Sequence, residues 1–216
     1  MKRALVIAVL AILAAGAAAE TTFIVGGKSI VNETPFFGRS GLDAVRWQQL
    51  VVPSDGVAEG DLRRWEWHSS GGGTPGDFQQ FKVQFLEVDR SGLTLPFNSN
   101  YENQTPVVIA SGDPFVLDAP DAGWFGFDIT PSFNYTGRSL LVEVWWSGDS
   151  EGGTQCYSKN ATRESRCVYA CIRNSVNVNG YPNQGKIYNW LHYMRFTVSP
   201  IAVEPTSLGR VRALYR

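Results

Sequence analysis

Short runs in which apolar and polar residues alternate, separated by Gly, Pro, Asn and Asp, limit most strongly what this chain can fold into. The clearest run covers residues 78–88, where Phe81, Val83 and Phe85 alternate with polar side chains. A period of two residues places successive side chains on opposite faces of a β-strand. About ten such runs lie between residues 23 and 198, and none reads as an amphipathic helix. The sequence therefore predicts an all-β fold, a two-sheet antiparallel β-sandwich of about ten strands.

The start of the chain indicates where the protein acts. Lys2 and Arg3 precede an apolar stretch over residues 4–15, and small residues follow as far as Ala19. This arrangement is typical of a signal peptide, here residues 1–19, that is removed after Ala19. Charges and glycines interrupt every later apolar run, so no membrane span is expected after cleavage. We expect a secreted protein that is extracellular or associated with the cell surface.

The rest of the chain is long enough for one β domain of the larger kind. We assign residues 20–199 to the β-sandwich domain. Residues 200–216, which contain two prolines and a basic ending, are assigned to a C-terminal tail. We hypothesise that this tail is an address or attachment element, and a frayed terminus with an incidental pattern is the alternative. Without Lys2 and Arg3 the chain has 17 basic and 20 acidic side chains, a net charge of −3. The charges are scattered, which excludes a nucleic-acid partner.

Three cysteines follow the predicted signal peptide, an odd number in a compartment that favours disulfides. The polar segment 157–166 is typical of a hairpin loop, which would set Cys156 opposite Cys167. We therefore predict a disulfide between Cys156 and Cys167. Cys171 is then predicted to be a free thiol, because four residues along one strand span about 13 Å, too far for a bridge to Cys167.

The two histidines give little support to catalysis or metal binding. His68 and His192 each lie beside bulky aromatics in a strand pattern, and neither has the spacing of a zinc ligand pair. A Ser-His-Asp or Cys-His arrangement would need one of them. Carboxylates such as Glu66 and Glu143 occur singly in strand patterns, as in any β protein of this size. We expect no enzyme, no metal and no cofactor.

Two tryptophans occupy the same face of one predicted strand. Trp65 and Trp67 alternate with Arg64, Glu66 and His68, which share the other face. Since one face of a sandwich strand packs on the core, the pattern predicts that both tryptophans are buried.

A third tryptophan is the candidate for binding. Trp145 shares a strand face with Glu143, and in a later strand Tyr169 shares a face with Arg173. On the assumption that these two strands are neighbours, Trp145 and Tyr169 would form an outward aromatic platform of the kind that stacks on sugars. We predict Trp145, Tyr169, Glu143 and Arg173 as ligand-binding residues. Ordinary packing of Trp145 against a loop is the alternative.

The order of motifs resembles a known series. It includes Arg46-Trp47-Gln48-Gln49-Leu50, Gly60-x-Leu62-x-x-Trp65-x-Trp67 and Thr130-Pro131-Ser132-Phe133-Asn134-Tyr135-Thr136-Gly137. These motifs resemble the jelly-roll-like β-sandwich modules of large secreted and surface proteins of bacteria, a family that is mostly uncharacterised. The resemblance covers residues 36–198. It implies a jelly-roll-like sandwich with Trp65 and Trp67 in the core, and it places Trp145 where the family often has a polar residue.

Two functions from different classes remain open. The first is a non-catalytic binding module whose partner is an extracellular glycan, another extracellular polymer or a cell-surface protein. The second is a structural subunit of an envelope layer or filament, in which residues 21–30 act as an edge strand in self-assembly.

Overall fold

The structure, a computed structural model, describes residues 19–32, 35–36, 42–118, 121–147, 151–161, 165–173 and 184–200. The predicted signal peptide, apart from Ala19, and the predicted tail beyond Pro200 lie outside the described residues. The described residues form sixteen strands and two short 3₁₀ helices, so the all-β prediction is confirmed. The predicted count of about ten is too low, because five strands have three residues each and show no readable period.

The larger sheet has seven strands and is antiparallel throughout. Its main order is β1 (Thr21–Val25), β16 (Met194–Ser199), β4 (Gly60–Ser69), β12 (Cys156–Asn160) and β15 (Trp190–His192). Two further strands join it: β2 (Ile30–Asn32) pairs with β12, and β9 (Gly123–Tyr135) pairs with β4.

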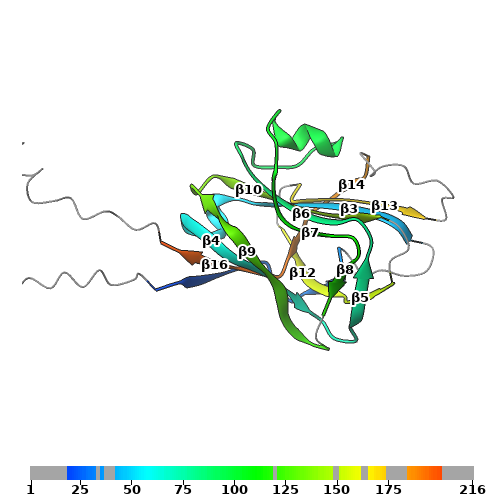
Figure 1. Cartoon of the computed structure of the whole chain (residues 1–216). Helices are drawn as coiled ribbons and strands as arrows, with labels where there is room; N and C mark the ends of the chain where they lie inside the picture. Colours follow the sequence, from blue (N-terminus) through cyan, green and yellow to red (C-terminus); the bar gives the residue numbers. More distant parts are fainter. Residues whose placement is uncertain are drawn as a thin grey trace, which may run out of the picture.

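The second sheet has six antiparallel strands and forms the upper layer in Figure 1, with β4, β9 and β16 below it. Its order is β14 (Lys186–Tyr188), β13 (Cys167–Arg173), β3 (Leu42–Val51), β10 (Ser139–Ser147), β6 (Phe81–Val88) and β7 (Val107–Gly112). A small third sheet contains β11 (Glu151–Gly153), β5 (Thr74–Phe78) and β8 (Phe115–Leu117).

The main core lies between the two large sheets and is rich in aromatic rings. Trp65 and Trp67 of β4 are fully buried, which confirms the prediction from strand alternation. The Trp65 ring lies 5.3 Å from that of Phe85 on β6, and Trp67 lies 5.8 Å from Trp47 on β3. These contacts cross from one sheet to the other. The two large sheets therefore pack face to face as a sandwich.

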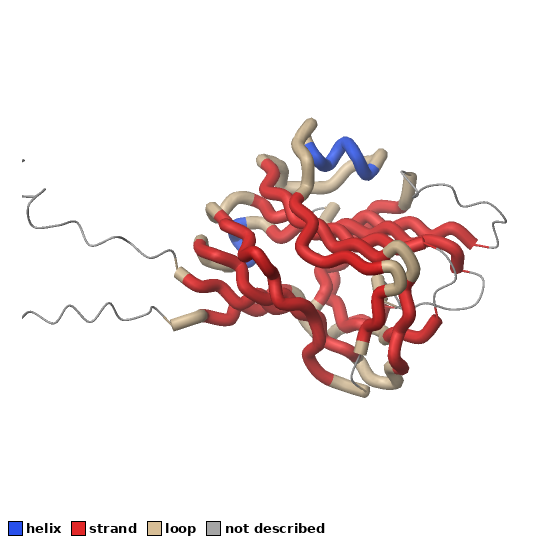
Figure 2. The backbone as a smooth tube through the Cα atoms, in the orientation of Figure 1, coloured by secondary structure: helices blue, strands red, loops and turns tan. Residues whose placement is uncertain are grey.

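A second, smaller core lies on the outer face of the six-stranded sheet. Leu50, Leu141 and Val168 pack there against Leu93 and Phe97. Phe97 begins the 3₁₀ helix η2 (Phe97–Tyr101), which Figure 2 shows in blue above the strands. We call residues 93–101 the covering segment. Because it buries apolar side chains on this face, the middle of the six-stranded sheet is enclosed on both sides.

The predicted hairpin between Cys156 and Cys167 is wrong. Cys156 lies on β12 in the seven-stranded sheet, whereas Cys167 lies on β13 in the six-stranded sheet. The chain changes sheets between these two strands, so the cysteines do not face each other across a hairpin. Cys156, Cys167 and Cys171 are free thiols, and the predicted disulfide is absent from the structure.

Candidate functional site

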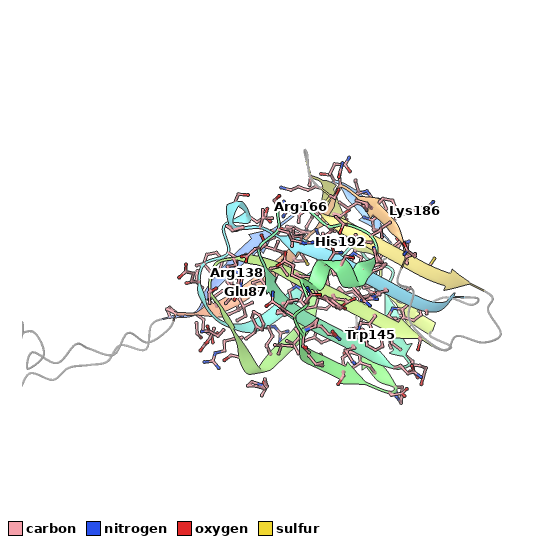
Figure 3. All side chains as sticks on the ribbon, turned by 90° about the horizontal axis from the view of Figure 1, so that it is seen from above. Glu87, Arg138, Trp145, Arg166, Lys186 and His192 are labelled. Carbon is pink, nitrogen blue, oxygen red and sulfur yellow. The ribbon has the colours of Figure 1, made fainter. Side chains whose placement is uncertain are left out.

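The predicted platform of Trp145 and Tyr169 does not form. Strand β3 lies between β10 and β13, so the assumed adjacency of the two strands is wrong. Trp145 pairs with Arg46, whereas Tyr169 pairs with Trp47. Since Arg46 and Trp47 are consecutive, Trp145 and Tyr169 lie on opposite faces of the sheet. In Figure 3 Trp145 is well separated from Lys186, the residue that pairs with Tyr169 at the other edge of this sheet.

The side chain of Glu143 is buried in a hydrogen-bonded network and is not exposed. Its side chain is 1% exposed and its Oε1 lies 2.5 Å from Nε of Arg46. Gln48 Nε2 donates to the same oxygen at 3.3 Å, and the Tyr101 hydroxyl donates to Oε2. Burial, reinforced by the charge of Glu143, raises the pKa of Tyr101 well above its usual value. This network attaches the covering segment to the sheet, so Glu143 is not available to a ligand.

Of the other predicted residues, Tyr169 and Cys171 lie at a groove. Tyr169 and Cys171 of β13 line it together with Gln184, Lys186 and Tyr188, and its volume is about 390 Å³. Arg173 is the last residue of β13 and pairs with Leu42, but its side chain lies outside the described part.

The structure brings together a different set of aromatic side chains, on the outer face of the seven-stranded sheet. His68 of β4 pairs with Trp124 of β9 on one side. On its other side the His68 amide donates to the Tyr193 carbonyl at 3.1 Å, and the Tyr193 amide donates to the Tyr157 carbonyl at 2.8 Å. The backbone thus places these four residues side by side across the sheet, and their rings form one cluster. We call Trp124, His68, Tyr193 and Tyr157 the aromatic row.

The rings of the aromatic row contact one another and are all half-buried. The His68 ring centroid lies 5.0 Å from that of Trp124, 5.4 Å from Tyr193 and 5.6 Å from Tyr157. Trp124 and Tyr193 are 4.8 Å apart with 41° between their planes. Mutual contacts at these distances restrict the rings. The row therefore presents a continuous, ordered aromatic surface.

An ion pair supports the Trp124 end of the row. Arg195 of β16 donates to both carboxylate oxygens of Glu66, at 2.5 and 2.8 Å, and its guanidinium lies 4.6 Å from the Trp124 ring centroid. Gly126 pairs with Glu66, and a Cβ at Gly126 would lie 2.5 Å from the Glu66 Cα. Only glycine at position 126 leaves room for Glu66 and its ion pair with Arg195. Burial would raise the pKa of Glu66, but hydrogen bonds and charge from Arg195 and Arg64 outweigh it, and this pKa is lowered.

A tight loop brings a cation to the other end of the row. Gly26 has a φ of +85°, and a Cβ there would lie 2.0 Å from the His192 carbonyl oxygen. The loop after β1 therefore lies directly on the backbone of β15. It places Nζ of Lys28 5.6 Å from the ring centroids of both Tyr157 and Tyr193, within the range of a cation–π contact.

His68, at the centre of the row, has a neutral imidazole ring. Its Nδ1 lies 2.7 Å from the Ser69 carbonyl oxygen, which accepts hydrogen bonds only, so Nδ1 carries the proton. Burial lowers the pKa of His68, the hydrogen bond to the Ser69 carbonyl raises it, and the charges of Lys28 and Arg195 lower it; the net effect is a lowered pKa. Among the described residues no group bonds Nε2, which leaves this nitrogen as an acceptor for a ligand hydroxyl.

Sequence reasoning missed most of this row. It placed His68 on the outward face of its strand, which is correct, but it did not single out Trp124, Tyr157 or Tyr193. Each of these three belongs to a different segment, and their proximity depends on strand pairing. The available signal was the presence of single aromatics on otherwise polar faces, such as Tyr157 beside Lys159.

Within the described ranges no helix is sufficiently long and apolar to cross a membrane. In the same part of the chain no group of three His, Cys, Asp or Glu side chains is arranged to hold a metal ion.

Comparisons with known proteins identify no family. No family model matches the chain, and no curated protein matches it. One similar solved structure contains the cysteine protease and lectin-like domains of Cwp84, a surface layer associated protein of Clostridium difficile. Its identity is 9% and its TM-score is 0.39, and the match covers 73% of this chain and 32% of that chain. The chain thus spans about a third of that structure, and a match at this level carries no argument about function.

Proposed function

We propose that the protein is a secreted, non-catalytic module that binds an extracellular glycan through the aromatic row. The observation that carries this proposal is the cluster of four half-buried rings on one outward sheet face. The apolar faces of sugar rings stack on aromatic rings, and contiguous exposed aromatic surface marks an interaction site. The Nε2 of His68 and the hydroxyls of Tyr157 and Tyr193 supply polar partners for sugar hydroxyls.

The chemistry of the described histidines and cysteines favours binding over catalysis. His192 is fully buried, and its Nδ1 lies 3.1 Å from the amide oxygen of Gln49. The ring of His68 lies among Trp124, Tyr193 and Tyr157, and among the described residues no hydroxyl or thiol is bonded to its Nε2 as a nucleophile would be. Burial raises the pKa of Cys156 and Cys167, which suppresses the thiolate that a nucleophile needs.

A second candidate function is that of a structural subunit. Strand β1 lies at the edge of the seven-stranded sheet and pairs with β16 on one side. Its Ile24 is 55% exposed. An edge strand with an exposed apolar side chain is suited to pairing with another copy. Light scattering tests this candidate, since assembly predicts a particle mass that rises with concentration.

Binding to soluble polysaccharides tests the main proposal. Residues 20–216 are run in affinity gels that contain each of a set of neutral and acidic polysaccharides. We expect retardation in at least one gel, and Trp124→Ala is expected to abolish it while the protein stays folded.

The matched control is Trp145→Ala, the same substitution on the other sheet. Trp145 is half-buried and stacks under Nζ of Lys82 at 4.3 Å, away from the aromatic row. The Trp145→Ala variant should be retarded as strongly as the wild type. Loss of binding in Trp145→Ala alone, or the absence of retardation by any polysaccharide, would overturn the proposal.

A further inference from the structure

We infer that the glycan bound by the aromatic row is anionic, and that Lys28 and Lys159 recognise its carboxylate or phosphate groups. This inference rests on the proposed function and specifies the ligand class of the same site. We call Lys28 and Lys159 the lysine pair.

The two lysines lie beside the same end of the row. Lys28 is exposed, and its Nζ is equally distant from the Tyr157 and Tyr193 rings, at 5.6 Å. Lys159 is two residues beyond Tyr157 on β12, and it therefore shares the outer face with that ring. Lys159 is also exposed. A ligand that stacks on Tyr157 thus lies within reach of both ammonium groups.

Glycine explains how the loop that carries Lys28 comes so close to Lys159. A Cβ placed on Gly27 would lie 3.3 Å from Cδ of Lys159 and 3.7 Å from its Cβ. The Lys159 stem therefore packs along the loop backbone, which restricts the directions that this side chain takes. The amide of Ser29 donates to the Ser158 carbonyl at 2.9 Å and fixes the loop on β12. The two cations are brought together by these contacts.

The lysine pair carries charge that the neighbouring cations do not. Arg195 and Arg64 are both paired with Glu66, and Arg64 also bonds Asp128 at 2.6 Å. In contrast, no carboxylate among the described residues forms an ion pair with Lys28 or Lys159. The positive charge is therefore uncompensated locally, although the whole chain has a formal net charge of −1. Such a patch attracts an anion more than its surroundings do.

Stacking and charge act on different parts of one ligand. The rings take the apolar face of a sugar, whereas an ammonium is a compact charge on a flexible stem that suits a carboxylate or phosphate. The row and the lysine pair are contiguous, so a chain of acidic sugars satisfies both at once. A neutral glycan would leave both ammonium groups without a partner.

The test compares acidic polysaccharides with their own neutral forms. Polygalacturonate, hyaluronate, alginate and a phosphate-bearing teichoic acid are titrated into residues 20–216 by calorimetry, together with carboxyl-reduced versions of the first three. We expect at least one acidic form to bind more than tenfold more tightly than its neutral counterpart, with an affinity that falls as salt rises.

Variants assign the charge preference to the lysine pair. Exposed ion pairs contribute little individually, so Lys28→Gln with Lys159→Gln is expected to weaken acidic binding by about fivefold to tenfold. The double variant should leave binding to a neutral form unchanged. Lys82→Gln, which removes a lysine beside Trp145 on the other sheet, is the matched control. It should change neither the binding of the acidic form nor that of the neutral form.

The outcomes separate this inference from the proposed function. Equal binding of acidic and reduced forms, abolished by Trp124→Ala, would overturn the anionic specificity and retain the glycan site. An acidic preference that survives in the double lysine variant would show that the lysine pair is not responsible and overturn the assignment. Binding to none of these polysaccharides, acidic or neutral, would overturn the inference and count against glycan binding as well.

Discussion

Removing Arg46 should reveal how strongly the structure depends on the buried pair that it forms with Glu143. The side chains are 8% and 1% exposed, and Arg46 also donates to Asn98 and to the hydroxyl of Tyr101. Arg46→Met keeps the length of the side chain but leaves the Glu143 carboxylate buried without its cation. Breaking a buried pair in this way costs about 3–5 kcal/mol. In a domain of this size that corresponds to a fall in Tm of roughly 6–20 °C.

The double variant Arg46→Met with Glu143→Leu should recover most of this loss. It removes both charges and fills the space with apolar groups, which is often neutral or stabilising. Part of the loss should remain, because the Tyr101 hydroxyl would lose its acceptor and the Gln48 amide would keep only the Phe97 carbonyl, at about 1 kcal/mol for each lost hydrogen bond. Calorimetric melts of the wild type, both single variants and the double variant give the coupling energy directly.

Arg138→Met is the control for this cycle. Arg138 pairs with Asp89 at 2.7 Å, but the two side chains are 39% and 77% exposed. An exposed pair contributes about 0–1 kcal/mol, so its loss should shift Tm by only a few degrees. If Arg46→Met costs no more than Arg138→Met, then Glu143 is not buried in a paired network, and its predicted role as a ligand residue would have to be reconsidered.

Three further predictions follow from the core, the thiols and the supporting ion pair. Brief alkylation of the native protein should modify half-buried Cys171 but leave Cys156 and Cys167 unmodified until the protein unfolds; a peptide joining Cys156 to Cys167 in non-reducing mass spectrometry would contradict the fold. Trp65→Ala should cost about 3–5 kcal/mol in denaturant unfolding; Trp65→Phe should cost much less, since the buried indole N–H has no partner among the described residues, and equal losses would contradict this. Because the pKa of Glu66 is lowered, its contribution to folding stability is present above the usual carboxyl pKa and is lost as pH falls through the lowered value. Thermal melts from pH 7 to pH 2 should therefore show Glu66→Gln less stable than the wild type at neutral pH and equal to it in acid. A constant difference in stability would refute the coupling.

The sequence predicted which face of a strand a residue occupies better than it predicted which strands lie side by side. Alternation along β4 assigned Trp65 and Trp67 to the core and His68 to the outside, because the two-residue period is a local property of one strand. Strand order is not local. The insertion of β3 between β10 and β13 separated Trp145 from Tyr169, and nothing in either strand's own pattern indicated it.

The local sequence pattern also could not predict which side chains on the outer faces of the sheets are buried. Glu143 does lie on the face opposite the main core, as predicted, but the covering segment encloses that face, and Arg46 of the neighbouring strand β3 pairs with the carboxylate there. The segment arrives from a distant part of the chain. For the same reason the aromatic row was not predicted. Trp124 and Tyr193 are 69 residues apart in sequence, and they meet only because β9 pairs with β4 and the Tyr193 carbonyl, between β15 and β16, accepts from the His68 amide.

The most direct test of binding at the aromatic row is a titration followed by the indole N–H signals in NMR. The chain has seven tryptophans, and each gives one indole signal. An oligosaccharide cut from the best-binding polysaccharide is added stepwise to the ¹⁵N-labelled protein. The account predicts that the Trp124 signal shifts with saturation while the Trp145 signal stays in place. A saturating shift of Trp145 with Trp124 unchanged, or no shift at any tryptophan, would contradict it.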